Sequence, residues 1–175
     1  MFVHHRRKEE RLERLVFGAL AGLSATTAMT AAMRHLWPRL SAEDRYPLPP
    51  REIIEEVKPI GGENASRIQT LLAHFGFGAL AGTLYAALPG RRPNGVLYGL
   101  AVWAGSYLGW IPALSILEPA TRHPAERNLL MLAVHVVWGA ALAASLSELE
   151  GATKSIFADG PAADADERFS GRRRA

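Results

Sequence analysis

Long apolar runs alternate with charged segments along this chain of 175 residues. A helix needs about 20 apolar residues to cross a hydrocarbon core of about 30 Å. The runs have that length and contain no Asp, Glu, Lys or Arg; they cover residues 15–33, 70–89, 95–117 and 128–147. We therefore predict an all-α integral membrane protein with spans at about residues 15–36, 70–89, 95–117 and 128–147.

The connections between the spans predict their arrangement. Two of them, 90–94 and 118–127, are short, so the spans that they join should be antiparallel neighbours. We expect an up-down-up-down four-helix bundle within residues 15–149. The basic segment 1–14 precedes the first span, which places both termini in the cytoplasm. The tail 151–175 is rich in Ala, Asp, Glu, Gly and Arg without an apolar period, and this composition predicts disorder.

The first loop is the longest connection and contains a helical pattern of its own. After a proline-rich stretch, residues 51–58 predict a short helix that carries Ile53, Ile54 and Val57 on one face. Such an interfacial helix would lie on the membrane surface or plug the mouth of the bundle. Alternatively, it packs on the span ends as a capped loop helix.

Small residues recur at intervals of four within the spans, which places them on one face of each helix. Lipid gives helices no hydrophobic reason to associate, so close backbone approach across small residues must provide the packing. The expected packing glycines are Gly18, Gly22, Gly78, Gly82, Gly99 and Gly139, and the third span adds Gly95, Gly105 and Gly109. The sequence FGALAG occurs at 17–22 and at 77–82, which either a duplicated two-helix unit or convergence would explain.

The ionisable side chains within the spans are those of His74 and His135. Their helices should run in the same direction, with both histidines at a similar depth near the outer end. They are either neutral imidazoles that hydrogen-bond between helices or part of a functional site. Further candidate polar groups are His35, Thr26 and Thr30. Whether the histidines bind a metal is left open. Metal sites normally use a third ligand or a carboxylate, and neither accompanies the histidines in the spans.

Composition excludes several kinds of chemistry. The absence of Cys rules out disulfides, thiolate catalysis and Cys-ligated metals. Because the sequence lacks a Gly-rich phosphate loop, HExxH, GxSxG and paired carboxylates in a span, we expect no enzymatic activity. The net charge of +3 reflects basic residues that flank the spans, so nucleic acid is not an expected partner. Glu118 and Arg127 are expected to pair across the last loop.

The residues YPLPPREI at 46–53, a following span with His and Gly, and HVVWG at 135–139 resemble the YagU-like family. In layout the resemblance covers most of residues 15–149. It implies a multi-pass protein of the bacterial cytoplasmic (inner) membrane with undefined biochemical activity, in a family linked to acid tolerance. No catalytic residues come with the resemblance, and this chain is shorter between its first two spans than the family's pattern.

Three functions are compatible with the sequence. The default is a non-enzymatic accessory or scaffold protein, whose small-residue faces pack within the bundle and against a second copy or another membrane protein. A pH-responsive transporter or channel element would use His74 and His135, since histidine ordinarily titrates at about pH 6.5. A haem b protein would use the same two histidines as axial ligands. Threonines that face the histidines would favour transport.

Overall fold

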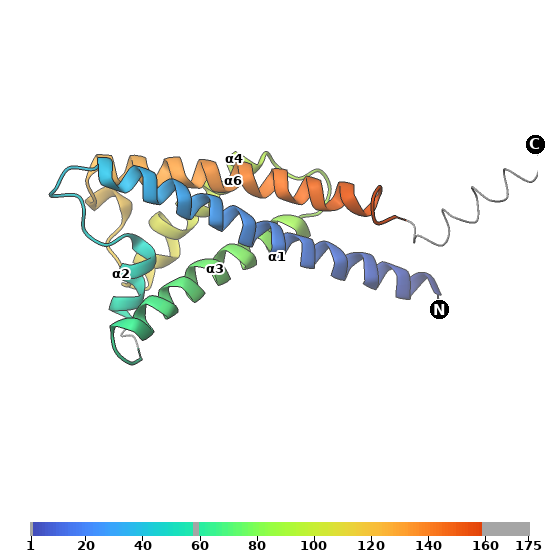
Figure 1. Cartoon of the computed structure of the whole chain (residues 1–175), viewed down its shortest axis with the longest axis horizontal. Helices are drawn as coiled ribbons and strands as arrows, with labels where there is room; N and C mark the ends of the chain where they lie inside the picture. The colour runs from blue at the N-terminus through green and yellow to red at the C-terminus, as the bar shows by residue number, and fades with distance from the viewer. Residues whose placement is uncertain (1, 58–59, 159–175) are drawn as a thin grey trace, which may run out of the picture.

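The computed structural model describes residues 2–57 and 60–158, and over these residues every regular element is helical (Figure 1). In chain order these are α1 (Phe2–Leu36), η1 (Trp37–Arg39), α2 (Pro49–Glu56), α3 (Glu63–Ala87), α4 (Gly95–Ala104), η2 (Gly105–Trp110), α5 (Ile111–Ala113), η3 (Ala120–Arg122) and α6 (Ala125–Thr153). Four segments are long and apolar enough to cross a membrane: Glu9–Arg39, Glu63–Ala87, Gly95–Ala113 and Ala125–Thr153. The predicted all-α fold of four packed apolar helices, with a short helix in the first loop, is confirmed.

The four long helices alternate in direction. Figure 1 shows the start of α1 and the end of α6 at one end of the bundle, with α2 and the first loop at the opposite end. Backbones approach closely between α1 and α3, between α1 and α6, and between α4 and α6. Within the described residues, α3 and α4 share no comparable contact. Their shared boundary, the α3–α4 seam, is bridged by side chains: the Tyr98 hydroxyl donates to the Ala81 carbonyl at 2.7 Å, and the Tyr85 and Tyr98 rings are 4.8 Å apart.

Glycines form the two tightest contacts, as the sequence pattern predicts. Gly18 and Gly22 of α1 face Gly78 and Gly82 of α3, so that a Cβ added at Gly82 would lie 2.7 Å from the Gly22 Cα. On the other side of the bundle, Gly95 and Gly99 of α4 face Gly139 of α6. Gly105 differs from this pattern, because a Cβ there would meet no atom within 4 Å. The glycine stripes therefore define two helix pairs, α1–α3 and α4–α6.

The third span is interrupted, which we did not predict, although Gly109 and Pro112 lie inside it. α4 ends at Ala104, and the segment Gly105–Trp110 continues as a π-helix with a kink at Gly109, where φ is −108° and ψ is −106°. A π-helical turn is rare and often marks a functional site. At membrane depth, irregular backbone is tolerated where it is buried in protein or lines a cavity.

The ends of the helices also differ from the predicted boundaries. α1 begins at Phe2, so residues 2–14 of the basic segment continue the first span as helix. α6 runs to Thr153, beyond residue 151, where we expected disorder to begin. Residues 159–175 of that expected tail lie outside the described residues.

Replacing Gly82 with Leu should force α1 and α3 apart, because its side chain would enter space that the α1 backbone occupies. Overpacking of this kind costs about 1–3 kcal/mol, so the melting temperature of the purified protein should fall. Gly76→Leu is the matched control, since a Cβ at Gly76 of the same helix meets nothing within 4 Å. Equal melting temperatures for the two variants would contradict the assigned contact.

Candidate functional site

A cavity of about 270 Å³ lies within the bundle, toward the end that carries α2. Its walls come from α1, α2, α3, the interrupted third span and α6. Most of the lining is aliphatic or aromatic, and no Asp, Glu, Lys or Arg of the described residues lines it. An engineered apolar cavity of about 150 Å³ in another protein admits benzene, so this space is large enough for a ligand.

His74 of α3 lines this cavity in a fixed hydrogen-bonded state. The Thr30 hydroxyl donates to the Thr26 carbonyl at 2.7 Å, because a carbonyl oxygen only accepts. The same hydroxyl lies 3.3 Å from His74 Nε2, and with its own proton already used it must accept a hydrogen bond there. His74 is therefore the Nε2–H tautomer, and its Nδ1 carries a free lone pair.

His135 of α6 lines the same cavity with the opposite ring nitrogen protonated. Its Nδ1 lies 2.7 Å from the Met131 carbonyl oxygen, so Nδ1 must be the donor. Within the described residues Nε2 has no hydrogen-bond partner and keeps its lone pair. Both neutral imidazoles thus offer one acceptor nitrogen in a cavity that has no acidic side chain to stabilise an imidazolium.

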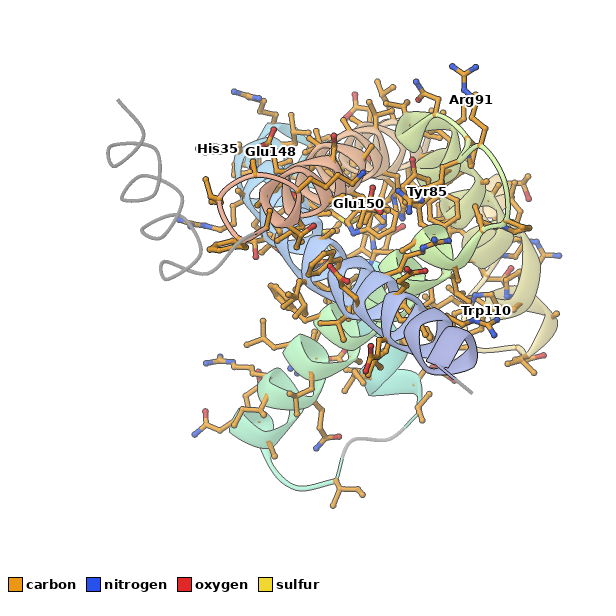
Figure 2. The ribbon with its side chains drawn as sticks, turned by 90° about the vertical axis from the view of Figure 1, so that its right-hand side faces the viewer. His35, Tyr85, Arg91, Trp110, Glu148 and Glu150 are labelled. Atoms are coloured by element: carbon orange, nitrogen blue, oxygen red, sulfur yellow. The ribbon has the colours of Figure 1, made fainter. Side chains whose placement is uncertain are left out.

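The structure brings together four of the five polar candidates. Thr26 also lines the cavity; its hydroxyl donates to the Gly22 carbonyl at 2.8 Å and accepts from Trp138 Nε1 at 3.1 Å. Thr30 reaches the site through His74. His35 does not, because it is exposed on the last turn of α1 and lies outside the lining, at the periphery in Figure 2.

Sequence reasoning missed several cavity residues. Met29 and Met33 of α1 and Met131 of α6 all line it, each less than 10 % exposed. Trp103 and Tyr107 also line it, and neither the Trp103 Nε1–H nor the Tyr107 hydroxyl has a hydrogen-bond partner among the described residues. The spacing of four between Met29 and Met33, and between Met131 and His135, was the available signal.

The short helix α2 lies at one end of the cavity and contributes to its wall. Pro49, Pro50 and Ile53 belong to the lining, whereas Val57, which the sequence places on the same face as Ile53, is exposed. Proline at the helix start leaves no unsatisfied N–H at that position, which suits a helix whose first residue, Pro49, is buried. Of the placements considered for this helix, the structure shows packing on the span ends in which three side chains also form the cavity wall.

Arg127, in the first turn of α6, holds this loop in place. Its side chain is fully buried, donates to the carbonyl oxygens of Tyr46 and Pro47, and forms an ion pair with Glu52 Oε2 at 2.9 Å. The guanidinium carbon also lies 3.5 Å from the centroid of the Tyr46 ring, a cation–π contact. Burial raises the pKa of Glu52, and the neighbouring Arg127 opposes that rise without cancelling it.

The expected pairing of Glu118 with Arg127 is wrong. Glu118 pairs instead with Arg122 at 2.6 Å, and both side chains are exposed. Glu118 and Arg122 are four positions apart, so their side chains can meet within the loop. Arg127 instead binds carbonyl oxygens and a carboxylate of the first loop, which only the folded chain brings near it.

Comparisons with protein-family models, with curated proteins and with solved structures find no match to this chain. The resemblance to the YagU-like family therefore stays a prediction.

Replacing Arg127 with Leu should destabilise the protein by about 3–5 kcal/mol, because the Glu52 carboxylate and two loop carbonyls would lose their buried partner. Glu52→Gln should cost less, on the order of 1–2 kcal/mol, since the amide oxygen still accepts from the guanidinium. Thermal or denaturant unfolding in detergent measures both. Arg122→Leu, which breaks an exposed pair, is the control and should change stability by at most about 1 kcal/mol. A loss for Arg127→Leu no larger than for this control would contradict the loop-anchoring role.

Proposed function

We propose that this protein is a non-enzymatic, multi-pass protein of the bacterial cytoplasmic membrane that binds a small ligand in the cavity between its two helix pairs. The observation that carries the proposal is the pair of histidines, which come from different helices, line the same cavity and each keep one ring nitrogen without a hydrogen-bond partner among the described residues. The π-helical segment of the third span supports it, because it supplies cavity residues where a regular helix would continue.

A pure scaffold role has less support. The glycine faces that suggested contacts between proteins are occupied within this chain, α1 against α3 and α4 against α6. Among the polar side chains of the cavity, Thr26 takes part in that packing through its contact with Gly78, whereas the side chains of His74 and His135 are not among the atoms nearest to any packing glycine. Association with a second copy or another membrane protein would therefore use other surfaces.

The two other functions place different demands on the same histidines. A pH-responsive element needs a stabilised imidazolium, and no carboxylate among the described residues lines the cavity. Thr30 contacts His74, which favours transport, but most of the remaining cavity lining is apolar and gives no continuous polar path. A haem b protein needs both imidazoles on one iron, and an absorbance spectrum of the purified protein near the Soret band tests that alternative.

The proposed topology has both termini in the cytoplasm, with α2 and the cavity toward the outer face. It is supported by the basic residues ahead of the first span and by the common end of α1 and α6 in Figure 1. Reporters fused after Ala42 and after Ala175 should give opposite signals, the first periplasmic and the second cytoplasmic. A periplasmic signal at Ala175 would reverse the orientation.

Ligand binding is tested by filling the cavity. Ser106 lines it and Leu108, two residues on, is exposed, so Ser106→Phe and Leu108→Phe add the same ring inside and outside. Protein purified from its native membrane is denatured, and small molecules and metals that co-purify are measured by mass spectrometry. We expect a species near one per chain in the wild type and in Leu108→Phe, and its loss in Ser106→Phe.

Folding of each variant is checked by its melting temperature. A species retained by a folded Ser106→Phe protein would place binding outside the cavity. If the wild type carries no stoichiometric species and gains no thermal stability from added metals or small apolar molecules, the ligand-binding function is overturned and a scaffold role is left.

A further inference from the structure

Residues that carry soft ligand atoms line one cavity of this protein. The sequence has four methionines, and the three after Met1 all line the cavity together with the two span histidines. Met29 and Met33 are one turn apart on α1, and Met131 is one turn before His135 on α6. His74 adds an imidazole from α3. Three helices therefore contribute three thioethers and two imidazoles to the same wall.

The histidines are held as metal ligands usually are. A metal-binding imidazole almost always donates its other ring N–H to a carbonyl, a carboxylate or water, which fixes the tautomer and directs the free lone pair. His135 donates to the Met131 carbonyl, and His74 donates to the Thr30 hydroxyl. In each ring one nitrogen is thus occupied by an outer partner, and the other is left to bind.

The kind of ligand atom selects the kind of metal. No group of three or more His, Cys, Asp and Glu gathers among the described residues, so a hard or carboxylate-bound cation has no site here. Thioether sulfur is a soft ligand that favours Cu(I), and imidazole also suits copper. A monovalent ion suits a neutral, apolar cavity better than a divalent ion, because the cost of burying an uncompensated charge is smaller.

We infer that the cavity binds a soft monovalent cation, Cu(I), through ligands drawn from the side chains of Met29, Met33, Met131, His74 and His135. The inference rests on the proposed ligand-binding function and names its ligand. It also accounts for Thr30, whose hydroxyl fixes the His74 tautomer from the layer behind the metal ligands.

The test uses the full-length purified protein and Ag(I), a soft monovalent probe that does not change oxidation state during the measurement. With methyl-13C-methionine labelling, the four methyl resonances report on each thioether separately. Titration with Ag(I) should shift the resonances of Met29, Met33 and Met131 up to one equivalent and leave Met1 unchanged. Cu(I) affinity is then measured by competition with bicinchoninate.

The variants separate ligands from packing. Met131→Leu and His135→Gln remove a metal ligand while keeping side-chain size, and each should weaken Cu(I) binding by about tenfold or more. Thr30→Val, which keeps the shape but frees the His74 tautomer, should weaken binding by about tenfold as well. Leu142→Met is the control, a buried exchange on α6 outside the cavity that should leave the affinity unchanged.

The outcomes distinguish this inference from the proposed function. If Ag(I) shifts no cavity methionine, or shifts Met1 equally, the methionines are only apolar filling and the copper site is overturned. If a neutral compound then co-purifies with the wild type and is lost in Ser106→Phe, the ligand-binding function holds without copper. Cu(I) binding that survives every ligand variant would likewise place the metal elsewhere and overturn the assignment.

Discussion

Close backbone contact across glycine is the constraint on which the rest of this structure depends. Helices in lipid gain nothing from burying apolar side chains against one another, so dispersion contacts at short distance must hold them together. In this chain such contacts join α1 to α3 through Gly18, Gly22, Gly78 and Gly82, and α4 to α6 through Gly95, Gly99 and Gly139. Because both pairs are held by backbone, the boundary between α3 and α4 is free to carry large side chains and to enclose a cavity.

The end of the bundle that carries α2 is stabilised by a different force. Arg127 gathers the carbonyls of Tyr46 and Pro47 and the carboxylate of Glu52 around one buried guanidinium. The ring of His123 stacks on those of Tyr46 and Tyr107, with centroids 6.3 and 5.3 Å apart, which joins the last loop and the π-helical segment to the same cluster. The wall that α2 contributes to the cavity is therefore fixed by electrostatics and aromatic stacking, although the helices below it are fixed by glycine.

The fold could be predicted from the sequence where the determining pattern is local. Apolar length specifies the spans, spacing by four places Gly22 and Gly78 on facing sides, and the two span histidines stand out because so few polar groups occur there. The pairing of Arg127 with Glu52 could not be predicted, because these residues are 75 positions apart and several carboxylates were equally plausible partners. The π-helical segment Gly105–Trp110 was missed for another reason: Gly109 and Pro112, which weaken a regular helix, lie inside a segment that we treated as one continuous span because of its apolar length.

The two helix pairs resemble each other, but the bundle departs from two-fold symmetry at the α3–α4 seam. The contact of Gly22 with Gly78 corresponds to that of Gly95 with Gly139, and His74 and His135 each precede the second glycine by four residues. An operation that exchanged the pairs would exchange the α1–α6 boundary with the α3–α4 boundary, yet within the described residues α1 and α6 pack closely along their backbones and α3 and α4 do not. When Gly22 of α1 is matched with Gly95 of α4, Thr30 corresponds to Trp103. A large indole ring in one pair therefore takes the position of a small hydroxyl group in the other. Whether the pairs arose by duplication or by convergence, the departure from two-fold symmetry gives the bundle one internal site where a symmetric bundle would have two or none.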